Sequence, residues 1–181
     1  MRLFIGIPLA AAVAHQLSAI TARLQSYGGG LRCPPPESWH ITLQFLGNAS
    51  QEQCQCVAER LRSLHLPPVP VRLGALGFFD RAGVFLATVE PSPGLLLLQQ
   101  SVTAATAPCG FAPEARPYQP HITLARSGRG QREAILALKA KIGQTPRFTG
   151  FVAGEFLLYE SFLSPAGSRY EVRARFPLDG R

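Results

Sequence analysis

The tetrapeptide His-Ile-Thr-Leu occurs twice in this chain, at residues 40–43 and at residues 121–124, with one copy in each half of the 181-residue sequence. Isoleucine and threonine favour β-strands, and successive side chains of a strand point to opposite faces. The histidine and the threonine of each copy therefore share one face, and the isoleucine and the leucine share the other. The repeat predicts two strands, each with an apolar face on a core and with an imidazole and a hydroxyl facing a cleft.

The segments around the two copies follow the same order, which predicts an internal duplication. Ser50, with Gln53 three residues later, forms a capping box that opens a helix. In the first half of the chain the predicted elements are a strand at 2–8, a helix at 10–27, the first motif strand and the helix after Ser50. A hairpin at 71–90, turning near 80–83, and a helix at 94–106 follow. The second half continues with the second motif strand, a helix carrying Ile135, Leu138 and Ile142, and strands between 148 and 177 around a turn at 165–167. We expect a single bilobal α+β domain over residues 1–181. Its two pseudo-symmetric lobes each have an antiparallel sheet with helices outside, and the active-site cleft lies between them.

The first residues admit two interpretations. Arg2, followed by an apolar run to Ala14, looks like a short secretory signal. However, residues 3–9 alternate as in a strand, and residues 13–24 then switch to helical spacing. Cleavage after Ala14 would divide that helix, so we expect a strand and a helix here.

The composition is that of a folded, basic protein. Hydrophobic residues make up 46% of the chain and charged residues 16%, which excludes an intrinsically disordered protein. The net charge is +7, and the positively charged side chains other than Lys139 and Lys141 are arginines. Arginine suits bidentate contact with phosphate, although an arginine-rich genome gives the same bias. The alternating Arg169, Arg173 and Arg175 form either an RNA track or a solvated face.

The sequence has no recognisable metal or disulfide pattern. Cys33, Cys54, Cys56 and Cys109 lack the paired C-x-x-C spacing, so the sequence indicates neither a zinc site nor a disulfide framework. We therefore expect free thiols in a reducing compartment. The 11 acidic residues are scattered along the chain, which offers little for a carboxylate-bound metal. We expect neither a metal nor another cofactor.

Both motifs lie in longer segments that are similar to those of a known family. The segments are RLFIGI at residues 2–7, WHITLQFLG at 39–47, PHITLAR at 120–126 and the pattern S-x-L-x-x-x-G-x-x-Y at 161–170. With these segments at these spacings, nearly the whole chain resembles the two-histidine (2H) phosphoesterases. Within them it resembles the RNA 2′,3′-cyclic phosphodiesterases, which are also 2′-5′ RNA ligase-like.

Two histidines and two hydroxyls suit the opening of a cyclic phosphodiester. Water is deprotonated on one side of the phosphorus while a ribose oxygen is protonated on the other. Two imidazoles can do both if one is neutral and the other is protonated. The hydroxyls of Thr42 and Thr123 would stabilise the charge on the phosphate oxygens. The symmetry of the motifs leaves open which histidine is the acid.

The family resemblance implies a role for each residue. His40 would be the proton donor to the 3′ oxygen, and His121 the proton acceptor that activates water, so that the product ends in a 2′-phosphomonoester. Arg126 would contact the phosphate. Strict alternation places Arg126 on the face opposite His121, so the strand has to end or bulge before it.

Three other functions remain open. They are 2′-5′ RNA ligation in the same cleft, a cyclic phosphodiesterase acting on a small nucleotide metabolite, and a non-catalytic RNA-binding module. The expected partner is an RNA with a 2′,3′-cyclic phosphate end, such as a tRNA fragment, and not a membrane. We expect a monomer in the cytoplasm.

The aromatic residues near the motifs have a structural and a functional interpretation. Trp39 is adjacent to His40 on the strand, so it faces the core. Phe78, Phe79 and Phe85 either stack on a base or pack in the core.

Overall fold

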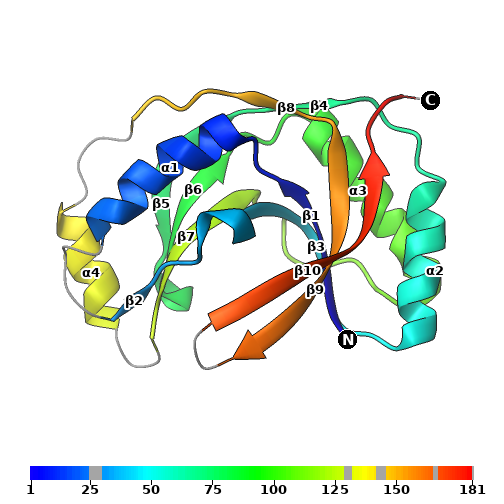
Figure 1. Cartoon of the computed structure of the whole chain (residues 1–181), viewed down its shortest axis with the longest axis horizontal. Helices are drawn as coiled ribbons and strands as arrows, with labels where there is room; N and C mark the ends of the chain where they lie inside the picture. Colours follow the sequence, from blue (N-terminus) through cyan, green and yellow to red (C-terminus); the bar gives the residue numbers. More distant parts are fainter. Residues whose placement is uncertain (25–29, 129–131, 142–145, 165–166, 181) are drawn as a thin grey trace.

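The computed structural model describes residues 1–24, 30–128, 132–141, 146–164 and 167–180, and most of its strands form two four-stranded sheets (Figure 1). The first sheet has the strand order β10 (Gly167–Pro177), β9 (Glu155–Ser164), β1 (Arg2–Pro8) and β3 (His40–Asn48). The second has the order β2 (Leu31–Arg32), β7 (His121–Ser127), β6 (Val84–Val89) and β5 (Leu73–Phe79). Neighbouring strands in both sheets are antiparallel, which together with the helices confirms the α+β fold class.

The helices α1 and α3 each pack on the sheet of the opposite half of the chain. Helix α1 (Ala11–Leu24) follows β1 but contacts β7, as does α4 (Arg132–Lys141). Helix α3 (Pro93–Thr106) follows β6 but contacts β3 and α2 (Gln51–Arg62). In Figure 1, α1 and α4 accordingly lie beside the second sheet, and α2 and α3 beside the first. This exchange ties the two sheets together. Among the described residues, no helix has the length and apolarity needed to span a bilayer.

The local signals at the helix and hairpin ends are confirmed. The Ser50 side chain accepts from the backbone N–H of Gln53, and the Gln53 side chain accepts from the backbone N–H of Ser50. The hairpin between β5 and β6 turns through a 3₁₀ segment, Asp80–Ala82, and then Gly83 at a φ of +61°. The left-handed conformation at this position favours glycine. The predicted helix end at 25–27, Ile142, and the turn residues 165–166 lie outside the described residues.

Two short strands, β2 and β4 (Val69–Val71), were not predicted as they are observed. Strand β2 covers only two residues and pairs with β7, so it is too short to show a period of two. Strand β4 starts before the predicted hairpin and pairs with β8 (Phe151–Ala153) instead of joining it. Neither pairing follows from local sequence, because both partners lie far away along the chain.

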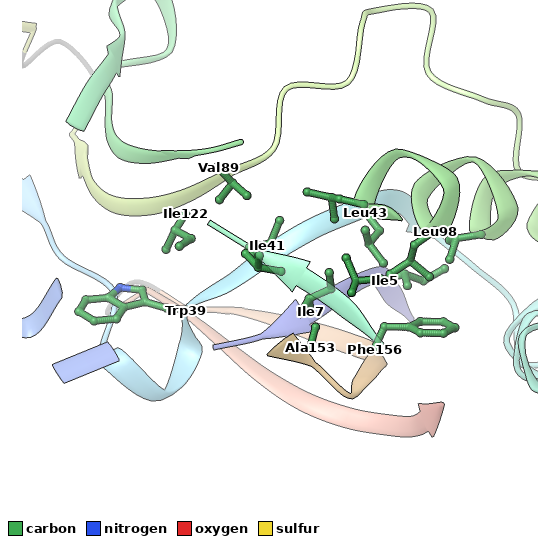
Figure 2. Packing of buried hydrophobic residues seen from close by; sticks show 14 of the residues in the cluster. Ile5, Ile7, Trp39, Ile41, Leu43, Val89, Leu98, Ile122, Ala153 and Phe156 are labelled. Atoms are coloured by element: carbon green, nitrogen blue, oxygen red, sulfur yellow. The ribbon is translucent and has the colours of Figure 1, made fainter. Parts of the chain in front are cut away.

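One buried cluster joins the two motif strands. Ile41 and Ile122, the isoleucines of the two motifs, are both fully buried members of it. Figure 2 shows them with Ile7 and Trp39. The predicted position of Trp39 in the core is confirmed. Because the isoleucines occupy a shared core, the histidines one residue before them are turned to the other faces of their strands.

The expectation of free thiols is wrong for two of the four cysteines. Cys56 of α2 and Cys109, just after α3, form a disulfide with their Cα atoms 5.9 Å apart. Helices α2 and α3 pack against each other, and this packing brings together two cysteines separated by 53 residues. No sequence motif predicts a disulfide between cysteines this far apart in the chain. Cys33 and Cys54 are free thiols, as expected.

The disulfide predicts a stability difference between two neighbouring cysteines. Closing a loop of 53 residues restricts the unfolded chain, so Cys56→Ser is expected to lower the free energy of unfolding by about 2–4 kcal/mol. The Cys54→Ser variant, two residues away at a free thiol, is the matched control and is expected to unfold like the wild type. Urea titrations without reductant measure both. Equal midpoints for the two variants would contradict the stabilising role of the disulfide.

Candidate active site

His40 and His121 are the first residues of β3 and β7, and the same backbone contact holds both rings. The Nδ1 atom of His40 lies 2.7 Å from the carbonyl oxygen of Ser38, and Nδ1 of His121 lies 2.8 Å from that of Gln119. A carbonyl oxygen only accepts, so Nδ1 carries the proton in each ring. Nε2 is therefore the nitrogen of each ring that is left to exchange a proton with a substrate.

Each motif strand bulges at its leucine. In the first sheet, Gly6 pairs with Thr42 and Ile5 with Gln44, so Leu43 has no partner on β1. In the second sheet, β6 pairs with Thr123 and Ala125 and skips Leu124 in the same way. The bulge that Arg126 requires is therefore present, and its equivalent at the same place in the first motif parallels the predicted internal duplication.

The bulge returns Arg126 to the face that carries the motif side chains. Its guanidinium donates a hydrogen bond, at 3.4 Å, to the hydroxyl of Thr123. Both histidines also respond to the charge of Arg126, which lowers the pKa of each. Phe45 holds the corresponding place in the first motif and is 57% exposed. The second sheet thus contributes the guanidinium of Arg126 to the site, and the first sheet contributes the ring of Phe45 at the equivalent position.

Aromatic rings enclose His40. The ring centres of Phe4, Tyr170 and Tyr159 lie 4.5, 5.3 and 5.8 Å from its own. Burial is the main reason that the pKa of His40 falls to about 4, and repulsion from His121 and Arg126 lowers it further, against the opposing effect of the Ser38 carbonyl. The repulsion from His121 also means that the two imidazoles lie close enough to interact.

His121 has a more open setting. The ring of Phe79 lies edge-on to it at 4.9 Å. Burial and the charge of Arg126 lower the pKa of His121, while its contact with the Gln119 carbonyl opposes that change. The larger depression is at His40. The site therefore contains two imidazoles of different acidity.

Gly6 allows the close approach of His40 to β1. A Cβ at Gly6 would lie 3.0 Å from the carbonyl oxygen of Ile41 and 3.4 Å from Cδ2 of His40. On the motif strand itself, the half-buried Thr42 is fixed by Tyr118, whose hydroxyl donates to the Thr42 carbonyl at 3.0 Å. Burial raises the pKa of Tyr118, so it remains a donor. These contacts hold the first motif in place from both sides.

Some side chains near the site were not identified from the sequence. Phe4 alternates with the core residues Leu3 and Ile5 on β1, so the strand pattern could have placed it beside His40. The positions of Tyr118 and Tyr159 have no such signal, because long-range packing brings them to the motifs. Phe79 is the phenylalanine of the central hairpin that reaches the site.

The remaining candidates have structural partners. Phe85 is fully buried and packs on Phe78 at 5.1 Å, which supports the core interpretation for both. The arginines of β10 form ion pairs with acidic neighbours: Arg169 with Glu171, Arg173 with Glu160, and Arg175 with Glu155. This pairing favours the solvated face over an RNA track. Among the described residues, no group of three His, Cys, Asp or Glu side chains is placed to hold a metal ion.

A cavity of about 680 Å³ opens beside His121. It runs from Thr42 and Phe45 on β3 to the exposed face of α3 and to the segment 113–119. His40, Thr123 and Arg126 do not line it. The cavity therefore extends the site in one direction, away from the ring-enclosed His40.

The chain is similar in sequence to proteins named RNA 2′,3′-cyclic phosphodiesterase. The protein named RNA 2′,3′-cyclic phosphodiesterase from Geobacillus stearothermophilus is 29% identical over 98% of this chain, which spans 57% of that relative's length. The protein of the same name from Aeropyrum pernix is also 29% identical, over 88% of this chain and 95% of its own.

Solved structures agree with this match. LigT of E. coli, complexed with 3′-AMP, superposes with a TM-score of 0.82 at 26% identity, covering 98% of this chain and 97% of LigT. A second solved structure, TT0787 of Thermus thermophilus, gives a TM-score of 0.79 at 28% identity, with 99% of both chains covered. Residues 9–159 match the 2′-5′ RNA ligase superfamily, and the chain therefore belongs to this family.

Proposed function

We propose that this protein hydrolyses RNA 2′,3′-cyclic phosphate ends to 2′-phosphomonoesters. The observation that carries the proposal is the pair of equivalent histidines, each with Nδ1 bound to a backbone carbonyl and Nε2 left for chemistry. Relatives aligned over most of this chain are named RNA 2′,3′-cyclic phosphodiesterase, and the similar LigT has been solved with a nucleotide, 3′-AMP.

The proposed reaction is an in-line displacement at phosphorus. Nε2 of His121 takes a proton from water, and the water oxygen forms a bond to phosphorus. The bond from phosphorus to the 3′ oxygen breaks, and Nε2 of His40 gives its proton to that oxygen. The hydroxyls of Thr42 and Thr123 and the guanidinium of Arg126 stabilise the charge that develops on the phosphate oxygens.

The unequal pKa values determine which singly protonated form of the pair is populated. A ring whose pKa is about 4, as at His40, is a strong acid once it is protonated. An anionic phosphate in the site favours that protonated form. His121, whose pKa is less depressed, is the better proton acceptor. In the free enzyme the single proton therefore resides mainly on His121, and the productive form, with His40 protonated, carries the same number of protons.

The proposal extends to the cellular setting. RNA ends with cyclic phosphates are the substrate class, with tRNA fragments as candidates, and the chain acts as a monomer in the cytoplasm. The Cys56–Cys109 disulfide would be an exception there, because reducing conditions keep most thiols free. A substrate that is RNA and not a small metabolite predicts binding that weakens steeply with salt and strengthens with oligonucleotide length.

Product analysis tests the proposed reaction. An RNA oligonucleotide ending in a 2′,3′-cyclic phosphate is incubated with the enzyme in EDTA, and the position of the phosphate in the product is resolved. We expect complete conversion to the 2′-phosphate, because the two histidines supply both proton transfers. A 3′-phosphate product would reverse the leaving group, and absence of conversion by the folded protein would refute the proposal.

A further inference from the structure

The residues just before His121 are held by three hydrogen bonds to three different places. The hydroxyl of Tyr118 donates to the carbonyl oxygen of Thr42 on β3, at 3.0 Å. The carbonyl oxygen of Gln119 lies 2.8 Å from Nδ1 of His121. The carbonyl oxygen of Pro120 accepts, at 3.0 Å, from the backbone N–H at the end of β6. This short segment therefore contacts both motifs as well as the central hairpin.

Prolines make this segment stiff. Pro117 and Pro120 flank Tyr118 and Gln119. The ring of a proline fixes its own φ angle, and the residue before a proline, here Gln119, is restricted to extended conformations. A displacement of Tyr118 is therefore passed along the backbone to the carbonyl of Gln119. The ring of His121 moves with it, because that carbonyl holds its Nδ1 atom.

The hydrogen bond between Tyr118 and Thr42 joins the two halves of the site. Thr42 is two residues after His40 on the same strand, and its carbonyl is about 7 Å further along, since a strand rises about 3.3 Å per residue. Strand β3 lies at the edge of its sheet, so a donor from outside that sheet can reach its backbone. Tyr118 supplies the donor from the segment that leads into β7. Its hydroxyl therefore links the strand that begins at one histidine to the residues that hold the other.

We propose that Tyr118 is a positioning residue for hydrolysis, and that its hydroxyl sets the separation of His40 and His121. The inference rests on the proposed function, since an in-line displacement needs the two Nε2 atoms on opposite sides of one phosphorus. Tyr118 does not itself transfer a proton: its hydroxyl is bonded to a backbone carbonyl, and burial raises its pKa. A misplacement of about 1 Å can lower a rate about 100-fold, so the loss of this one hydrogen bond should be visible in kcat.

The variant Tyr118→Phe isolates the hydroxyl. The ring of Tyr118 packs against the buried cluster that contains Ile41 and Ile122, and phenylalanine keeps that packing. We expect kcat for the cyclic phosphate oligonucleotide to fall roughly 10–100-fold. KM should change less than about twofold, because the hydroxyl is directed at the backbone and not at the substrate. The matched control, Thr21→Val, removes a hydroxyl that donates to the Ser18 carbonyl within α1 at 3.2 Å, and should leave both constants unchanged.

The pKa of His40 reports the same separation. Burial does most to lower this pKa, and the charges of His121 and Arg126, both on β7, lower it further. The phenol rings of Tyr159 and Tyr170, which also face His40, belong to its own sheet. A larger distance between β3 and β7 would therefore weaken the repulsion from β7 and raise the pKa of His40.

NMR titration of the wild type and of Tyr118→Phe measures this pKa. We expect it to rise in the variant, because groups that repel each other move apart once the hydrogen bond is lost. His15 and His65, which are exposed, are internal controls and should titrate alike in both proteins. Wild-type kcat in Tyr118→Phe, or a fall in kcat without a rise in the pKa of His40, would overturn the proposal. A wild type that does not hydrolyse the substrate would instead refute the proposed function.

Discussion

Replacing either His40 or His121 by alanine is expected to abolish turnover of a cyclic phosphate RNA while the chain stays folded. A positioned acid or base contributes about 10²–10⁴-fold to a rate, and the two histidines act on one transition state. Each of His40→Ala and His121→Ala should therefore lower kcat by at least that factor. The loss in the double variant should be close to that of a single variant, because groups that act as a unit are not additive.

The chain provides its own controls for these variants. His15 on α1 and His65 after α2 are exposed, and alanine at either position should leave kcat unchanged. His40 packs on the ring of Phe4, so His40→Asn, which keeps more of the side-chain volume, separates lost chemistry from lost packing. Circular dichroism and urea titration report folding for each variant. Substantial residual turnover in folded His40→Ala or His121→Ala would contradict two-histidine catalysis.

Much of the site follows from the strand period alone. The spacing of His40 and Thr42, and of His121 and Thr123, places them on one face of each strand, and the burial of Ile41 and Ile122 agrees. The same period also shows that Arg126 needs a bulge, and the bulge is present. These features are local: each depends on residues that are neighbours in the sequence.

The features that the sequence could not predict depend on which elements pack together. The Cys56–Cys109 disulfide forms because α2 lies against α3, and the contact of Tyr118 with Thr42 joins residues 76 apart. The exchange of α1 and α3 between the sheets is likewise a property of tertiary packing. The acidity difference between the two histidines comes from the same source, because the rings that enclose His40 belong to β1, β9 and β10.

That acidity difference predicts an acidic optimum for kcat/KM. The active form has His40 protonated and His121 neutral, and it has the same number of protons as the more populated form with the proton on His121. Below the pKa of His40, about 4, both rings are protonated and no base is left. Above the pKa of His121, which burial and Arg126 hold below its ordinary value, both are neutral and no acid is left. We therefore expect kcat/KM to peak between these values and to fall about tenfold per pH unit above the upper one.

The pH profiles of kcat and kcat/KM, and the variant Arg126→Gln, test the cause of this acidic optimum. A bound phosphate anion favours the protonated imidazoles, so the bell of kcat should lie at higher pH than that of kcat/KM. Arg126 lowers the pKa of both histidines, so Arg126→Gln should move both limbs of kcat/KM to higher pH. Arg62→Gln, at an exposed arginine at the end of α2, is the matched control and should leave the limbs in place. Two results would contradict this account of the histidine pKa values. One is a wild-type pH profile of kcat/KM centred above pH 7, and the other is a profile that Arg126→Gln does not move. Either would mean that burial and the charge of Arg126 do not set the pKa values of His40 and His121.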